Sequence, residues 1–292
     1  MANNIWSDVS SIAQRIESDA IFIVREVNFL ENLVTVFRDM SGMNLRRGYA
    51  YNNLTANTMG DDDDLTSQAF TPSADQTLTP YQVGAQVFVT DARAESMLPE
   101  QIITDSAREL AFAAADKVMT DMVTDMASLE GGTVGAAGST ITWAYVSAGI
   151  QIARNANKNG AVPLACVLHG YQCGELAESA SIAGATQLTS APSYTDAINR
   201  QGNAMSAGTP VFMFLGVPVY QVFQSPDTSD DFTGGIFPRE ALAIDWRRQI
   251  RVRPERDESR SGLELNMTGI YDTGIWRPER GVVIVADAST PT

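Results

Sequence analysis

Apolar residues recur at steps of three and four positions along the first part of the chain. The positions are Ile5, Val9, Ile12, Ile16, Ala20, Ile23, Val27, Leu30 and Val34. An α-helix repeats every 3.6 residues, so this spacing places these side chains on one face and predicts an amphipathic helix of about 30 residues. The segment contains no second stripe for this face, so we expect it to pack on something else, including a neighbouring molecule.

A polar stretch over residues 49–80 follows and contains the acidic run Asp61–Asp64. Before this run, Tyr49 and Tyr51 alternate with small residues. After it, apolar and polar residues alternate over residues 82–90. A period of two is typical of a strand, so the pattern predicts a long β-hairpin with an acidic tip. A hairpin buries little surface by itself, and we expect it to need a partner, such as a second copy of the chain.

The clearest helical pattern begins at Pro99. Its apolar positions are Ile103, Ala107, Leu110, Ala114, Val118, Met122, Met126 and Leu129. Pro99 suits the first helical position, Glu100 suits the first turn, and Gly131 with Gly132 predicts the end of the helix. At 1.5 Å per residue this helix is about 45–50 Å long, which suits a structural spine.

The rest of the chain alternates between helices and strands. We interpret residues 131–140, which are rich in glycine, as a flexible connector. The pattern predicts helices near 143–158 and 171–180, and strands at 164–169, 211–215, 217–222, 241–244, 249–253, 263–271 and 282–285. The sequence therefore predicts an α+β fold with a middle α/β block.

Composition and charge narrow the function classes. The chain has 292 residues, with 35 acidic residues against 20 basic ones and a net charge of -15. Affinity for free duplex DNA or for an anionic membrane normally needs a basic excess, so both kinds of binding are disfavoured. Two cysteines are too few for a disulfide framework, and neither a signal-like start nor an apolar run of about 18 residues is present. We expect synthesis in a cytosol and no membrane span.

Candidate chemistry is sparse. His169 is the single histidine and ends a predicted buried strand, so we favour a structural role over a Ser-His-Asp site. Together with Cys166 and Cys173 it does not supply the four ligands of a closed zinc site. We predict no enzyme activity and no catalytic, cofactor-binding or metal residue. The run Asp61–Asp64 leaves two interpretations open, a hard-cation site and a solvated loop tip, and we favour the loop tip.

Seven arginines fall between residues 239 and 260. They are Arg239, Arg247, Arg248, Arg251, Arg253, Arg256 and Arg260, and five interleaved acidic residues leave a net charge of +2. Arg251 and Arg253 share one face of a strand, whereas Ile250 and Val252 share the other. DNA contact is one interpretation, and ion pairing between subunits is the one that we favour. The candidates for such contacts are Arg247, Arg248, Arg251, Arg253, Arg256, Asp61, Asp62, Asp63 and Asp64.

The order of these parts resembles a known family along nearly the whole chain. The stretches that resemble it are Leu33–Ser41 with Gly48, Val87–Asp91, Ala114–Asp116, Val167–His169 before Tyr171, and Gly216–Tyr220. The order and spacing of these stretches are similar to those of the Hong Kong 97-type major capsid proteins of tailed bacteriophages. Gly170 stands where that family often has a proline.

The resemblance implies an arm over residues 1–45, an extended β-hairpin loop over 46–92 and an axial domain over 136–234. The peripheral domain then combines residues 93–135, which include the spine helix, with 235–292. It also implies homo-pentamers and hexamers that form an icosahedral shell around double-stranded DNA, without specific DNA binding. The further partners that it implies are a separate scaffolding protein, a portal and a cement protein. The location is then the virion, after assembly in the host cytoplasm.

One departure from the family is the absence of lysine from residues 46–92. Some relatives cross-link covalently through a lysine in this loop, so we predict a shell held by non-covalent contacts. Two alternative functions stay open. One is an encapsulin-type compartment with the same fold, and the other is a soluble metal-dependent hydrolase.

Overall fold

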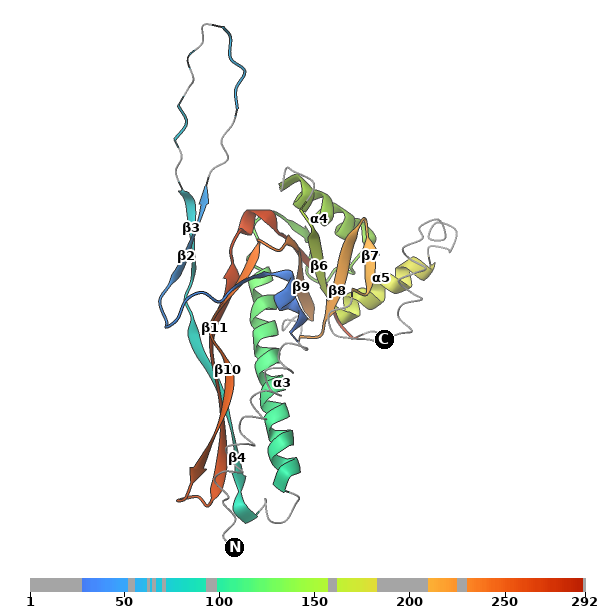
Figure 1. Cartoon of the computed structure of the whole chain (residues 1–292). Coiled ribbons are helices and arrows are strands. Elements are labelled where there is room, and N and C mark those ends of the chain that lie inside the picture. Colours follow the sequence, from blue (N-terminus) through green and yellow to red (C-terminus); the bar gives the residue numbers. More distant parts are fainter. Residues whose placement is uncertain are drawn as a thin grey trace.

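The computed structural model describes residues 28–51, 56–61, 64, 67–69, 72–92, 99–156, 162–182, 210–224 and 230–290. Most of the apolar stripe predicted for residues 5–34 lies outside these ranges. The described chain is α+β, with a four-stranded sheet beside a long helix, a six-stranded sheet with two helices, and a projecting two-stranded hairpin (Figure 1).

The four-stranded sheet is built around two long antiparallel strands. Its order is β1-β10-β11-β4, with bounds Thr35–Phe37, Leu242–Asp257, Gly262–Ile275 and Tyr81–Thr90. β1 is parallel to β10, and β11 is antiparallel to both β10 and β4. The two segments predicted at 241–244 and 249–253 are therefore one strand, interrupted by register shifts between Trp246 and Arg251.

The long helix α3, Pro99–Met126, lies along one face of this sheet (Figure 1). Its 28 residues give a length of about 42 Å. The predicted apolar stripe is buried wherever its side chains are described, from Ala107 to Leu129, so the spine-helix prediction is confirmed.

After the helix, the chain passes so close to the carbonyl oxygen of Gly281 that a Cβ on Gly131 would lie 2.5 Å from it. Glycine is needed there for this close approach.

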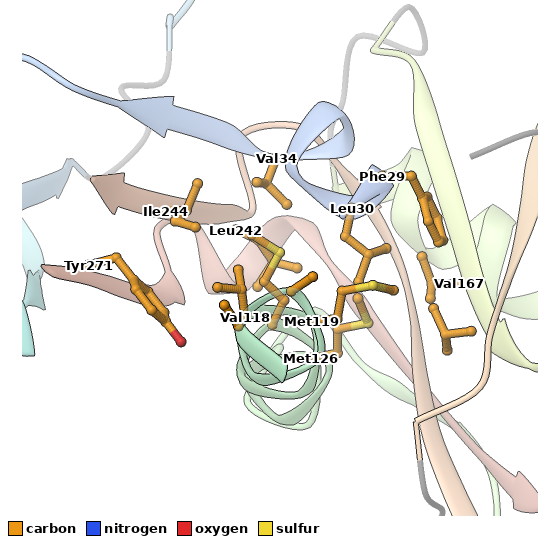
Figure 2. Close-up of a cluster of buried hydrophobic side chains, with 14 of the residues drawn as sticks. Phe29, Leu30, Val34, Val118, Met119, Met126, Val167, Leu242, Ile244 and Tyr271 are labelled. Atoms are coloured by element: carbon orange, nitrogen blue, oxygen red, sulfur yellow. The ribbon is translucent and has the colours of Figure 1, made fainter. Parts of the chain in front are cut away.

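The segment before β1 closes the core between α3 and the sheet. Phe29, Leu30 and Val34 are buried in one hydrophobic cluster with Val118, Met119 and Met126 of α3 and with Leu242 and Ile244 of β10 (Figure 2). The predicted helix does not continue to Val34, because Phe29–Leu33 forms the 3-10 helix η1 and the chain is extended from Val34 onwards. Tertiary packing and pairing with β10 override the helical spacing here.

The second sheet has the order β5-β12-β9-β6-β8-β7. Its strands are β5 Thr133–Gly135, β12 Val282–Asp287, β9 Asp231–Pro238, β6 Leu164–His169, β8 Val217–Val222 and β7 Phe212–Phe214. The helices α4, Trp143–Ala156, and α5, Gly170–Ile182, contribute to its separate core. These elements confirm the alternating middle block. The predicted flexible connector is wrong at residues 133–135, which form β5 and pair with β12.

Two features of this sheet, the strand β9 and the turn between β7 and β8, were not predicted from the sequence. β9 was not predicted as a separate strand, and it spans residues 234 and 235, where the boundary of the axial domain was placed. β7 and β8 are joined by Leu215 and Gly216, both with positive φ. This pair of left-handed residues suits a tight two-residue hairpin turn.

The projecting hairpin pairs β2, Arg46–Tyr51, with β3, Pro72–Leu78. A hairpin around the acidic run was predicted, but its return strand was placed at residues 82–90. Those residues belong to β4, which is an edge strand paired with β11. Its polar side chains, at alternating positions, are exposed. The alternation over residues 82–90 correctly predicted a strand, but the strand that pairs with β2 in the hairpin is β3.

Candidate assembly surfaces

The base of the hairpin is held to the four-stranded sheet by a buried ion network. Asp245 of β10 is fully buried, and its Oδ2 accepts a hydrogen bond from Arg46 Nε at 2.9 Å and forms an ion pair with Arg247 Nη2 at 2.7 Å. Arg247 Nη2 also donates to the carbonyl oxygen of Asn44 at 2.9 Å. Arg46 is the first residue of β2, so this network fixes the point at which the hairpin leaves the sheet.

Aromatic packing supports the same base. The Arg46 guanidinium lies 4.2 Å from the Phe37 ring centroid, and that ring makes an edge contact with Trp276 at 5.1 Å. A Cβ on Gly48 would lie 2.5 Å from the Trp276 ring, so only glycine allows β2 to approach it so closely. Leu78, the last residue of β3, is buried. The base is thus fixed on both strands.

The distal part of the hairpin has few contacts with the rest of the described chain. Residues 56–61 and 67–69 are exposed, and so are Asp61 and Asp64 of the acidic run. Asp62 and Asp63 lie outside the described residues. Figure 1 shows the hairpin extending away from both sheets. Its tip is therefore presented to solvent or to another molecule.

The face of the four-stranded sheet that points away from α3 is polar. Ile250 and Val252 are buried in the core beneath the helix, which places Arg251 and Arg253 on the opposite face, as predicted. Arg253 is exposed and Arg251 is half-buried. Their register partners on β11 are Thr268 and Asn266, and the next pair on the same face is Glu255 with Glu264, so the face presents the two arginines beside both neutral and acidic groups.

The remaining arginines of the cluster are distributed over several local roles. The Arg247 side chain is fully buried in the ion network described above. Arg256 donates to both carboxylate oxygens of Asp91, at 3.2 and 2.9 Å, and also pairs with Glu258. Arg260 lies 4.4 Å from the centroid of Phe88. Arg248 is half-buried, and Arg239 donates to the carbonyl oxygen of Val34 at 2.9 Å. Arg253, which is exposed, and Arg251, which is half-buried, lie together on the outer side of β10, and we call this surface the outer arginine face.

A second polar cluster lies between α3 and β11 and was missed by the sequence analysis. Asp121 of α3 accepts hydrogen bonds from Tyr81 at 2.7 Å and from Tyr271 at 2.9 Å, and it pairs with Lys117. One turn further along the helix, Asp125 is half-buried, and burial raises its pKa to about 6. The spacing of four residues between the two aspartates, beside the apolar stripe of the helix, was a signal available in the sequence.

Burial also raises the pKa of Asp272, on β11, to about 6. Its Oδ2 accepts a hydrogen bond from the Thr79 backbone N–H at 2.5 Å, which acts against the shift, whereas the nearby charges of Asp121 and Asp245 add to it. Thr79 lies between β3 and β4. This carboxylate therefore contacts the junction at which the hairpin returns to the sheet.

His169, Cys166 and Cys173, which were considered for metal or nucleophilic chemistry, are buried in the hydrophobic interior. His169 is buried among the rings of Tyr171, Phe223 and Phe232, and burial lowers its pKa. Cys166 and Cys173 are buried and unoxidised, and burial raises the pKa of both thiols. Within the described ranges, no group of three or more histidine, cysteine, aspartate or glutamate side chains is arranged to hold a metal ion.

Among the described helices, none is both long and apolar enough to cross a membrane. α3 is the longest of them, and one side of it is lined with exposed polar residues such as Arg108, Glu109 and Asp116.

The sequence matches no protein-family model and no curated protein. The fold, however, is shared with solved structures of shell proteins. The capsid of Ralstonia phage GP4 aligns with a TM-score of 0.65 and 12% identity, over 93% of this chain and 92% of that chain. The capsid of the cyanophage P-SCSP1u aligns with a TM-score of 0.61 and 14% identity, over 91% of this chain and 90% of that chain.

A virus-like particle from Pyrococcus furiosus aligns with a TM-score of 0.58 and 11% identity, over 93% of this chain and 98% of that chain. The fold is therefore that of proteins that build closed particles. More specifically, the chain has the Hong Kong 97-type fold of tailed-bacteriophage major capsid proteins, as predicted from its sequence.

Proposed function

We propose that this chain is the structural subunit of a bacteriophage capsid and assembles through pentamers and hexamers into an icosahedral shell around double-stranded DNA. The supporting observation is the pair of surfaces at opposite ends of the four-stranded sheet. The hairpin projects from one end of this sheet, and β10, which carries Arg251 and Arg253, runs toward the other end (Figure 1). The near full-length similarity to capsid structures supports the same role.

The geometry favours a contact between copies over one within a chain. Arg253 is eight residues beyond Asp245 along β10, which is about 25 Å of strand. The tip lies beyond β2 in the other direction, by at least its six residues, or about 20 Å. An ion pair between the acidic tip and the arginine face therefore needs a second molecule.

Charge complementarity gives the contact its chemical basis. We infer that Asp61–Asp64 of one copy approach Arg251 and Arg253 of another. Arginine binds carboxylates with two parallel N–H donors, which orients the contact as well as attracting it. Each such contact is weak, but every subunit repeats it, so the free energies add across a closed shell.

Electron microscopy of purified particles tests the role directly, and charge reversal tests the contact. We expect Arg253→Glu to abolish shells while the circular dichroism spectrum and the unfolding midpoint of the unassembled chain stay unchanged. Arg251→Glu is expected to act in the same way. Arg253→Lys keeps the charge and is the matched control, which should still assemble. Normal shells from both glutamate variants would exclude this contact.

An encapsulin-type compartment is the second candidate, and its support is the similarity to the virus-like particle from Pyrococcus furiosus. The two functions differ in the content of the particle. Nuclease-protected DNA of genome length inside particles from an infected host supports the capsid, and a protein cargo without DNA supports the compartment. The net charge of -15 does not favour specific DNA binding in either case.

A further inference from the structure

The polar cluster between α3 and β11 contains three aspartates, and burial and nearby negative charge raise the pKa of two of them, Asp125 and Asp272. Asp121 and Asp125 come from α3, and Asp272 comes from β11. Oδ2 of Asp125 is buried without a hydrogen-bond partner among the described residues. A buried carboxylate oxygen without a donor is costly when charged, and far less so when the group carries a proton.

The neighbouring charges do not neutralise the cluster. Lys117 is half-exposed and pairs with Asp121. Asp245 of β10 is the register partner of Asp272 and is also negatively charged. The nearby cations Arg46 and Arg247 both pair with Asp245.

Neutral groups complete the surroundings. Tyr81 of β4 and Tyr271 of β11 donate to Asp121, and a raised pKa keeps both phenols protonated. Thr273 hydrogen-bonds Asp125, and the Thr79 N–H binds Asp272. Among the described residues, Asp125 and Asp272 therefore remain as the two carboxylates of the cluster that pair with no cation.

We propose that Asp125 and Asp272 form a proton-sensitive joint between the second half of α3 and the strand that supports the base of the hairpin. Protonation of these two groups tightens the contact between helix and sheet, and ionisation loosens it. The joint does not depend on the proposed function, because every group in it belongs to one chain.

The direction of the effect follows from the two pKa values. Both carboxyls have a pKa of about 6 in the folded chain, above the ordinary value of 3.8, so the folded state binds these protons more tightly than the unfolded state does. Their stabilising contribution is fully present below about pH 4 and is lost as the pH rises through about 6. At neutral pH the joint is therefore at its weakest.

The test is Asp125→Asn, which mimics the protonated side chain at every pH. Amide hydrogen exchange is compared between this variant and the natural chain at one pH at a time, so that intrinsic exchange rates cancel. At about pH 7.5 we expect amides of residues 121–126 and 271–273 to exchange about a hundredfold more slowly in the variant, since the rise from 3.8 to about 6 is about two units of pKa and each unit is a tenfold change in equilibrium. At about pH 3.5, below the ordinary pKa of 3.8, the two proteins should agree.

Asp105→Asn is the matched control, because Asp105 is exposed on the same helix. It should leave exchange unchanged at both pH values. Asp272→Asn tests the joint from the strand side and should reproduce the effect, since asparagine keeps an oxygen for the Thr79 N–H. Equal or faster exchange in both cluster variants at about pH 7.5, or a difference of the same size that persists at about pH 3.5, would overturn the joint. Loss of particle assembly alone would not affect this result.

Discussion

At the scale of single residues, the least replaceable side chain in the described structure is Asp245. It is fully buried, its Oδ2 is shared by two guanidinium groups, and one of these, on Arg247, is also fully buried. A buried ion pair contributes little by itself, because desolvation offsets the attraction. Removal of one partner, however, leaves an unpaired charge in the interior.

Asp245→Asn keeps the shape of the side chain and removes its charge. We expect the free energy of unfolding to fall by about 3–5 kcal/mol, because Arg247 remains buried without a counter-ion. Urea denaturation measures this loss. The control is Asp39→Asn. Asp39 also pairs with Arg46, but its side chain is 66% exposed, so solvent screens the interaction. Equal stability of the two variants would show that the ion network does not hold the base of the hairpin.

At the scale of elements, the contact between α3 and the four-stranded sheet depends on small side chains. Ala111 and Ala115 are fully buried in the core cluster, beside the larger Val118 and Met122. Alanine allows the helix axis to come close to the sheet, and the packed interior leaves no space for a longer side chain.

Ala115→Leu therefore inserts a bulky side chain into this contact. We expect it to destabilise the chain by about 1–3 kcal/mol through strain, although leucine is a good helix former. Ala113→Leu makes the same change on the exposed side of the same helix and should be nearly neutral. The two unfolding midpoints, compared by thermal denaturation, check the expectation. A neutral Ala115→Leu would mean that the helix can shift away from the sheet at no cost.

The element scale also shows where local pattern and tertiary pairing disagree. Residues 82–90 alternate as a strand should, and they form one, but the closing strand of the hairpin is Pro72–Leu78. Pairing depends on which backbone donors and acceptors meet in three dimensions, and alternation does not contain that information.

At the scale of the whole molecule, two exposed surfaces bear on the proposed assembly. The projecting hairpin and the far end of β10 lie at opposite ends of the same sheet (Figure 1), and Arg251 and Arg253 lie on β10 beyond Asp245. When two complementary surfaces lie at opposite ends of a molecule, they favour head-to-tail contacts between identical subunits. Such contacts form a ring when the rotation from one subunit to the next adds up to a full turn.

The composition of the hairpin predicts how such a shell is held. Residues 46–92 contain no lysine, so an isopeptide bond from this loop has no amine donor. We expect boiled particles in detergent to run on a gel as a single band near the 31.5 kDa of the chain. A ladder of multimers that survives denaturation would contradict the non-covalent shell.

The sequence by itself determined the spine helix, the strands at 164–169 and 217–222, and the outward face of Arg251 and Arg253. Each of these follows from a local period, 3.6 or two, and local periods survive in any tertiary context that buries one face. The order of these parts was also enough to indicate the capsid fold.

Only the tertiary structure decided which residues of the candidate sites meet. It buried Arg247 with Asp245, placed Asp272 near enough to Asp125 to add to the rise that burial causes in the pKa of that carboxyl, and made the glycine-rich segment around Thr133 a strand. These residues lie far apart in the chain, and their pairing depends on backbone hydrogen bonds and close packing between distant segments. A local pattern of polar and apolar positions contains no record of such contacts.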